Sequence, residues 1–557
     1  MGLVEFHTFV GNDPARDAVT TPFTQQVVCP VLIGRVPQLD ALHQLIDGTS
    51  GGRGQAVLIA GEAGVGKSRL VAEAKAYAAA RGLPLLQGAC FPQDSACPYA
   101  PLLDLLRARF AGRTPPAVAA EVGPFAREVA SLLPDLAPLP ADPAPLPTLD
   151  PAQQKRRLFD ALAHCLIRRA TPQPLLLIVE DLHWSDEGSL DFLLYLLRRS
   201  AAQPLLLIGT YRADEVDPRL GHWLAQLDRE HLSAELSLAP LTRDEVAAMV
   251  RAIFALERPV RAELLDAIYT LTEGNPFYVE ELLKSLVAVG DIFYADGGWG
   301  RKPIEELRIP RSLHAAVQQR VAQLSDDARR LVALAAVVGR RFDFALLQRL
   351  AQIGEDDLLR LLKELIGAQL VVEESSEQFA FRHALTRQAI YADLLARERA
   401  ALHRRIAETI EHVYADSLNG HAPDLSYHFY AAGVWEKALN YARRAGERAQ
   451  ALGTPHAAIE QLTRALDAAG KLGAPPDPAL YLARGHAYDT VGDFACARED
   501  YELGLRLACE AHDGAAEWRS LIALGQLWAG RDYAQTGAWF RRALDLGQTL
   551  NDPRLLA

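Results

Sequence analysis

The sequence predicts a multidomain fold in which an α/β domain with a parallel sheet is followed by helical domains. A short apolar run at 56–60 leads into Gly61-Glu-Ala-Gly-Val-Gly-Lys-Ser68, and an Ala-, Leu- and Lys-rich stretch follows. A second apolar run, at 175–179, ends in Glu180-Asp181. From about residue 424 the chain is rich in alanine with repeat-like spacing. Strands that alternate with helices favour a parallel sheet, and 557 residues are too many for one core.

The segment between the first strand and helix matches the G-x-x-x-x-G-K-[ST] phosphate-binding loop at each fixed position. Gly61 and Gly66 allow the backbone to turn its N–H groups around the β- and γ-phosphates. Lys67 supplies a positive charge to those phosphates, and the Ser68 hydroxyl can ligate Mg²⁺. The predicted nucleoside triphosphate site comprises Gly61, Glu62, Ala63, Gly64, Val65, Gly66, Lys67, Ser68 and Arg69.

The acidic pair predicts the hydrolytic part of the site. Aliphatic residues that end in two acids are typical of a central strand that delivers carboxylates beside a triphosphate. We expect Glu180 to orient Mg²⁺ or its waters and Asp181 to polarise the attacking water, although the two roles can be exchanged between these neighbours. The predicted metal ligands are therefore Ser68, Glu180 and Asp181. A strand that merely happens to end in acids is the alternative, and the phosphate loop upstream argues against it.

Two later features extend the pattern. The run 205–211 predicts another buried strand, and Arg212 follows it, where a guanidinium could reach a γ-phosphate. An ordinary surface arginine is the alternative. In the segment 273–278, Pro276 cannot continue the preceding helix, so a helix–helix turn is expected there.

Composition narrows the class of protein. A net charge of −12 argues against a non-specific nucleic-acid coat or an anionic membrane surface as the partner. The six cysteines are scattered without ligand spacing, which favours reduced thiols over a disulfide or zinc framework. The N-terminus lacks a signal-peptide pattern, and the aliphatic runs are too short to span a bilayer. We expect a cytoplasmic protein without membrane association.

Several motifs together carry a resemblance to a known family. In chain order they are Val31-Leu-Ile-Gly-Arg35, the phosphate loop, Val179-Glu-Asp-Leu-His-Trp-Ser-Asp186, Gly209-Thr-Tyr-Arg212, Gly274-Asn-Pro-Phe-Tyr278, Phe379-Ala-Phe-Arg-His-Ala-Leu-Thr-Arg387 and Ala389-Ile-Tyr391. The set resembles the STAND class of signalling ATPases over residues 30–410. Within that class it is most similar to the ATPase core of large ATP-binding LuxR-family regulators, relatives of the maltose-regulon activator. The same core also occurs beside adenylate cyclase and protein kinase domains.

The resemblance implies roles for further residues. Gly34 and Arg35 would approach the adenine and ribose, and Arg212 would be the sensor arginine. Pro276 would pack against the adenine from a helical lid. His383 would touch the ADP β-phosphate and lock the resting state, with a buried structural histidine as the alternative. The Glu-Asp order of the acidic pair departs from the Asp-Asp or Asp-Glu common in such proteins. The departure leaves the division of labour between the acids, and the hydrolysis rate, open.

With the resemblance, the predicted fold is an α/β P-loop NTPase of AAA/STAND type, followed by a helical lid, a winged helix and a TPR-like α-helical solenoid. The expected boundaries are an N-terminal tail at 1–30, the ATPase domain at 31–235 with a proline-rich surface loop (Pro134 to Pro151), the lid at 236–320, the winged helix at 321–410 and the repeats at 424–557. A winged helix can bind DNA, but this segment is not notably basic and the family uses it as an internal clamp.

Small and aromatic residues carry the repeat prediction. Tyr481, Gly485, Tyr488, Ala497 and Tyr501 match positions of a tetratricopeptide repeat, a 34-residue helix pair. A plain helical bundle is the alternative. Stacked repeats form concave protein-binding surfaces, so a small-molecule or protein inducer is the expected partner. The chain stops after a repeat helix with neither a polar cap nor a DNA-binding module, and we expect either a fragment or a stand-alone sensor core.

The function expected from these features is an ATP-operated switch with ATP/ADP and Mg²⁺ as cofactors. An inducer would favour an ATP-bound form able to self-associate, and slow hydrolysis would reset it. The alternatives are an AAA-type ATPase that remodels a client, the regulatory ATPase region of a cyclase- or kinase-associated signalling protein, and a passive repeat scaffold with a vestigial site.

Overall fold

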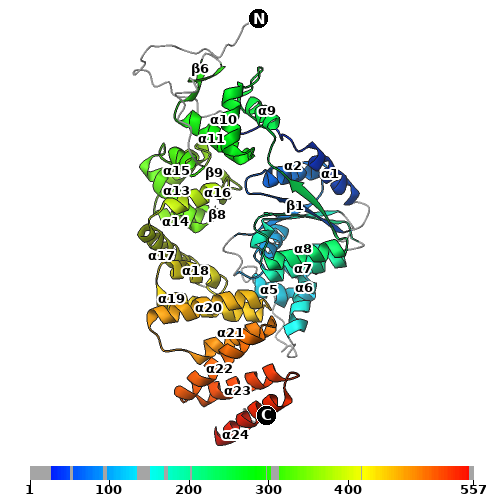
Figure 1. Ribbon diagram of the computed structural model, residues 1–557, viewed down its shortest axis with the longest axis vertical. Helices are drawn as coiled ribbons and strands as arrows, with labels where there is room; N and C mark the ends of the chain where they lie inside the picture. The colour runs from blue at the N-terminus through cyan, green and yellow to red at the C-terminus, as the bar shows by residue number, and fades with distance from the viewer. Residues whose placement is uncertain are drawn as a thin grey trace. The chain divides into compact units, whose positions relative to one another are not determined.

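The computed structural model describes residues 27–49, 54–91, 97–133, 151–167, 174–200, 203–295, 298–302, 313–415 and 417–550 (Figure 1). Nearly all of the predicted N-terminal tail and of the proline-rich loop lies outside these residues. Internal contacts divide the chain into two compact units. The first comprises the described parts of 1–85, 172–183 and 200–402, and the second those of 86–171, 184–199 and 403–557.

A five-stranded sheet forms the α/β core, in the order β2-β3-β4-β1-β5. Its strands are β1 (Gln55–Gly61), β2 (Leu85–Ala89), β3 (Leu175–Glu180), β4 (Leu205–Tyr211) and β5 (Ser233–Leu238). β1 is parallel to both β4 and β5, and β3 is parallel to β4. Every residue of β3 and β4 is buried, which explains their unbroken aliphatic sequences. The predicted fold class, a parallel-sheet P-loop core followed by a largely helical region, is confirmed.

The register of the sheet brings the candidate site residues to one edge. Ala60 of β1 pairs with Tyr211 of β4, and Val179 of β3 pairs with Gly209 of β4. The carboxyl ends of these three strands therefore meet, and ligands of such sheets bind beyond the carboxyl ends. Helix α2 (Lys67–Ala80) follows β1 directly. Together with α1 (Val36–Gly48) it covers the hydrophobic core that includes the residues of β1, β3 and β4.

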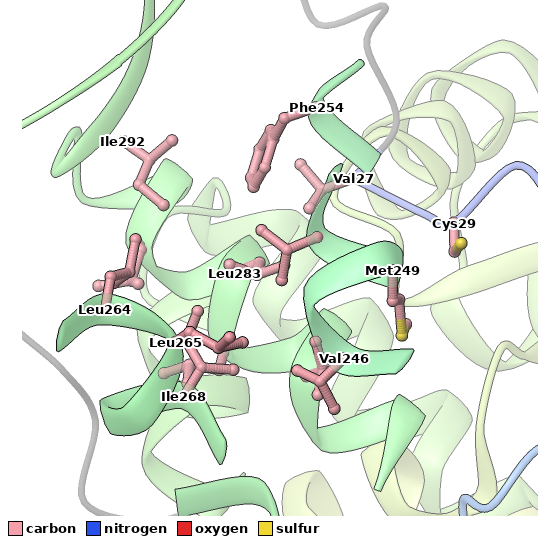
Figure 2. Close-up of a cluster of buried hydrophobic side chains, with 14 of the residues drawn as sticks. Val27, Cys29, Val246, Met249, Phe254, Leu264, Leu265, Ile268, Leu283 and Ile292 are labelled. Carbon is pink, nitrogen blue, oxygen red and sulfur yellow. The ribbon is translucent and has the colours of Figure 1, made fainter. Parts of the chain in front are cut away.

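Three helices and a hairpin form a second core of the first unit. They are α9 (Arg243–Phe254), α10 (Ala262–Thr272), α11 (Pro276–Ala288) and the strands β6 (Ile292–Ala295) and β7 (Gly298–Arg301). Figure 2 shows their buried side chains, among them Val246, Met249, Phe254, Leu264, Ile268 and Leu283, packed with Val27 and Cys29 from the start of the described chain. α9 begins with a capping box, in which the side chains of Thr242 and Glu245 accept from each other's backbone N–H groups.

A small antiparallel sheet with helices follows in the same unit. Its strands lie in the order β8-β10-β9, where β8 is Arg341–Asp343, β9 is Val371–Glu373 and β10 is Gln378–Phe381. The accompanying helices are α12 (Leu313–Val321), α13 (Asp326–Val338), α14 (Phe344–Ala351), α15 (Glu355–Gly367) and α16 (Ala384–Asp393). β10 is the central strand and is antiparallel to both β8 and β9.

The second unit is helical in its C-terminal part. After α17 (Ala396–Val413), which crosses the boundary between the units, come α18 (Ala422–Ala431), α19 (Trp435–Ala451), α20 (Pro455–Leu472), α21 (Pro478–Thr490), α22 (Phe494–Glu510), α23 (Gly514–Trp528) and α24 (Tyr533–Leu550). Small residues occur where consecutive helices touch. A Cβ at Gly485 would lie 2.6 Å from the ring of Tyr501, and one at Gly525 would lie 2.5 Å from that of Phe540.

The remaining helices of this unit are α3 (Ala100–Phe110), α4 (Pro115–Val122), α5 (Ala126–Leu132), α6 (Pro151–Ile167) and α7 (Glu187–Arg199). This division thus places part of the predicted 31–235 domain in the same unit as helices α18–α24. Among the described helices, none combines the length and apolar character needed to cross a membrane.

Candidate nucleotide-binding site

The segment between β1 and α2 has the backbone form of a phosphate-binding loop. Gly66 adopts a φ of 106°, a conformation that side chains disfavour, and α2 begins at the next residue. A Cβ at Gly64 would lie 2.8 Å from Oδ1 of Asn275, so only glycine permits this close approach. The free N–H groups at the start of α2 and its dipole favour an anion in front of the loop.

Lys67 and Ser68 are the first two residues of α2, and both side chains form hydrogen bonds within the protein. The Lys67 ammonium donates hydrogen bonds to the carbonyl oxygens of Gly61 at 2.7 Å and Glu62 at 2.8 Å. Burial lowers the pKa of Lys67 to about 8, and the charge of Asp181 opposes part of that effect. The Ser68 hydroxyl donates to the Glu180 carboxylate at 2.6 Å, so these two side chains meet at the loop.

Asp181 directly follows β3 and has an unusual backbone conformation. Its φ is 61°, in the left-handed region, and its N–H donates to the Thr210 hydroxyl at 2.9 Å. Non-glycine residues held in this region cost about 1–3 kcal/mol and cluster at functional sites. The Asp181 carboxylate forms an ion pair with the Arg340 guanidinium at 2.7 Å.

The wall of the cavity opposite the loop is formed by the chain around β8 and β10. Arg340, Arg382 and His383 line the same cavity as Lys67 and Ser68. The His383 ring lies 4.3 Å from the ring of Phe277, centroid to centroid. Burial lowers the pKa of His383 well below its ordinary value, and nearby cations, Lys284 the strongest of them, lower it further. His383 is therefore neutral at physiological pH.

The cavity carries a strong excess of positive charge. Its lining includes five cationic side chains, Lys67, Arg69, Arg212, Arg340 and Arg382, and one carboxylate, that of Asp181. The Nε atom of Arg382 is buried and has no hydrogen-bond partner among the described residues. Burial also lowers the pKa of this guanidinium. A buried N–H without an acceptor is costly, and an anion such as a di- or triphosphate could supply one.

Residues 31–208 match the family model of the AAA ATPase domain. This stretch is an AAA ATPase domain. It contains the phosphate loop and both acids of the Glu180-Asp181 pair, and AAA ATPase domains bind nucleotide, usually with Mg²⁺.

Two relatives and a solved structure are also similar to parts of the chain. An uncharacterised protein of Rhizobium meliloti (strain 1021) is 27% identical over 79% of this chain and 43% of its own length. The hybrid signal transduction histidine kinase G of Dictyostelium discoideum is 23% identical over 30% of this chain and 5% of its own. The chain therefore spans less than half of either relative. A STAND protein with a tetratricopeptide repeat sensor from Pyrococcus horikoshii aligns with 96% of this chain and 79% of its own, at 13% identity and a TM-score of 0.40.

The side chains of Ser68 and Glu180 fit a Mg²⁺ ion, which they would hold beside the phosphate loop. Ser68 and Glu180 already contact each other, and hydroxyl and carboxylate oxygens are ligands that Mg²⁺ accepts. Mg²⁺ usually takes one or two such protein ligands and completes its shell with water and substrate phosphates. Asp181, the third predicted ligand, is the next residue, but its carboxylate pairs with Arg340.

The helical segment after β5 is bonded directly to the phosphate loop. The Asn275 side chain donates to the carbonyl of Ala63 at 2.8 Å, and the Phe277 N–H donates to the carbonyl of Gly64 at 3.3 Å. Arg35 donates to the carbonyls of Val65 at 3.2 Å and Ala239 at 2.5 Å. These bonds join α11 and the segment before α1 to the same loop.

Of the predicted site residues, nine line the cavity, and they are Ala63, Gly64, Gly66, Lys67, Ser68, Arg69, Asp181, Arg212 and His383. The other seven, which lie outside its described lining, are Gly34, Arg35, Gly61, Glu62, Val65, Glu180 and Pro276. Three of these seven hydrogen-bond to lining residues, because Glu180 bonds Ser68 and the carbonyls of Gly61 and Glu62 accept from Lys67. Arg212 is buried and pairs with Glu215.

Five lining residues were not predicted from the sequence, and they are Phe277, Arg340, Arg382, Ala384 and Leu385. Phe277 lines the cavity where Pro276 was expected to pack, while Pro276 occupies the first turn of α11. Arg382 could have been suspected, because it precedes His383 directly. Arg340 carries no local signal, since 159 residues separate it from the Asp181 carboxylate that it contacts.

Proposed function

We propose that this protein is an ATP-binding switch of the STAND type, in which nucleotide bridges the AAA ATPase domain and the winged-helix segment. The observation that supports it most is the composition of the cavity. The phosphate loop forms one wall and Arg382 and His383 line the other, while the guanidinium of Arg340 is engaged by Asp181. A bound nucleotide would contact both walls and so stabilise the closed arrangement of the first unit.

The hydrolytic roles follow from the contacts. Lys67 would leave its two carbonyl partners for the β- and γ-phosphates. Ser68 and Glu180 would hold Mg²⁺, which neutralises the charge that develops on the phosphates. Asp181 would accept a hydrogen bond from the attacking water, and Arg212 would stabilise the γ-phosphate. Exchange of the two acidic roles remains open in this scheme.

As a switch, the protein needs a ligand with different affinities for its two forms. An inducer that binds the open form more tightly shifts the population, and one with equal affinities shifts nothing. We propose the helical repeats α18–α24 as the inducer's binding surface and an ATP-bound form that self-associates as the active state. Slow hydrolysis would return the protein to the ADP-bound resting form.

The output is proposed from the resemblance to LuxR-type transcription regulators, in which this part would be the sensor and ATPase. The relative from Dictyostelium is named as a signal transduction histidine kinase, which supports a second setting, a kinase-associated signalling protein. Both settings use the same ATP-operated switch.

The test is to purify the chain, denature it, and identify and count the released nucleotide, and then to measure ATP turnover on the native protein. ADP near one per chain with turnover well below about one per second supports a locked switch. An empty site with rapid turnover would instead favour an AAA-type ATPase that remodels a client.

A further inference from the structure

We propose that Arg340 is a positioning residue that occupies the Asp181 carboxylate and so suppresses ATP hydrolysis while the site is closed. The inference rests on the proposed function, because it assigns a means of regulation to the same site. It concerns a residue that lies outside the AAA ATPase domain match, in the segment between α13 and β8.

The contact itself is short and sheltered. Arg340 Nη1 lies 2.7 Å from Asp181 Oδ2, and the two side chains are 21% and 13% exposed. A hydrogen bond between two charged groups at this distance is about twice as strong as one between neutral groups. Both residues line the cavity that also holds Lys67 and Ser68, so the ion pair lies within the site.

Both partners are held in place by their backbones. Asp181 is fixed in its left-handed conformation by the hydrogen bond from its N–H to Thr210. The carbonyl of Arg340 accepts a hydrogen bond from the N–H of Phe381 at 2.8 Å, at the edge of the small sheet. Phe381 is followed directly by Arg382 and His383, so Arg340 is attached to the same wall as these residues.

The ion pair conflicts with the role proposed for Asp181. A carboxylate that polarises water must offer a free oxygen and enough basicity to accept a proton-sharing hydrogen bond. A guanidinium at 2.7 Å takes up one of those oxygens, so that oxygen is not offered to a water molecule. Hydrolysis then requires the wall that carries Arg340 to withdraw, which links the resetting reaction to prior opening of the switch.

The direct test is Arg340→Gln in the full chain, because glutamine keeps much of the side-chain length and removes the charge. Single-turnover hydrolysis of pre-bound ATP with Mg²⁺ measures the chemical step apart from ADP release. We expect a rise in rate of about tenfold, which corresponds to about 1.4 kcal/mol, with unchanged affinity for ADP. The matched control is Arg341→Gln, whose guanidinium pairs with Glu374 at 2.7 Å, and its rate should equal that of the unmodified protein.

An unchanged or lower rate for Arg340→Gln would overturn the proposal. So would a loss of ADP affinity, because Arg340 would then be a phosphate ligand. If this variant does not fold, as judged by its thermal transition, Arg340→Lys takes its place. Lysine keeps the charge but loses the planar fork, so we expect a smaller rise, and no rise would again overturn the inference. Absence of nucleotide binding by the unmodified protein would refute the proposed function itself.

Discussion

The side-chain amide of Asn275 donates a 2.8 Å hydrogen bond to the carbonyl of Ala63, 212 residues earlier in the chain. Its side-chain oxygen meanwhile accepts the N–H of Phe277 and caps α11. One buried residue thus begins the helix that carries Phe277 into the cavity and joins that helix to the phosphate loop. Movement of α11 and the shape of the loop are coupled through this residue.

Replacing Asn275 should separate its two roles. Asn275→Ala removes the hydrogen bond to the Ala63 carbonyl and the side-chain cap of α11, so the free energy of unfolding should fall by about 0.5–2 kcal/mol and ADP should bind more weakly. Asn275→Ser keeps a good helix cap but is too short to reach Ala63, so stability should largely return while ADP affinity stays low. Denaturant unfolding and calorimetric titration measure the two quantities. Full ADP affinity in the serine variant would contradict the role of the Ala63 contact.

Lys67 should make the stability of the nucleotide-free protein depend on pH. Burial lowers its pKa to about 8 from an ordinary value of 10.5. Between these values the unfolded chain binds more protons than the folded one, so stability contributed by this group rises with increasing pH. Against Lys67→Met, which cannot titrate, the unmodified protein should gain on the order of 1–3 kcal/mol from pH 8 to pH 10.5.

Deprotonation of Lys67 should also weaken nucleotide binding, although it raises the stability of the nucleotide-free protein. Phosphates attract the protonated amine, so ATP affinity should fall as the pH rises above about 8, by at most about tenfold per pH unit for one proton. Lys67→Ala should abolish nucleotide binding and leave the fold intact. Unchanged ATP affinity in that variant would contradict the assignment of the phosphate loop as the nucleotide-binding site.

Glu180 and Asp181 can be assigned their roles by comparing two amide variants. Glu180→Gln keeps an acceptor for the Ser68 hydroxyl but loses the charge that would hold Mg²⁺. It should therefore need more Mg²⁺ for hydrolysis and lower the rate by about 10²-fold or more. Asp181→Asn should lower the single-turnover rate by about 10²–10⁴-fold at an unchanged Mg²⁺ requirement. If the two Mg²⁺ profiles are interchanged, the acids have exchanged roles.

The parts of the site that the sequence predicted are those whose partners are close along the chain or follow from strand order. The phosphate loop is a local pattern between a strand and a helix, and Glu180 reaches Ser68 because β3 and β1 flank β4 in one parallel sheet. Arg340 and Phe277 were not predicted, because their places depend on tertiary packing that has no local signature. For the same reason Pro276 was expected in the cavity that its neighbour Phe277 lines.

The packing of α21 against α22 depends on small residues at the helix contact, and Gly485 offers the sharpest test. A Cβ there would lie 2.6 Å from Tyr501, whose side chain is fully buried against α21, so Gly485→Ala should force the two helices apart. We expect the free energy of unfolding to fall by about 1–3 kcal/mol. Gly470→Ala is the matched control, since among the described residues nothing lies within 4 Å of a Cβ at this helical position. That variant should gain about 0.5–1 kcal/mol, because alanine restricts the unfolded chain and favours the helix. Equal unfolding transitions for the two variants, measured by circular dichroism, would show that the α21–α22 contact can yield without cost.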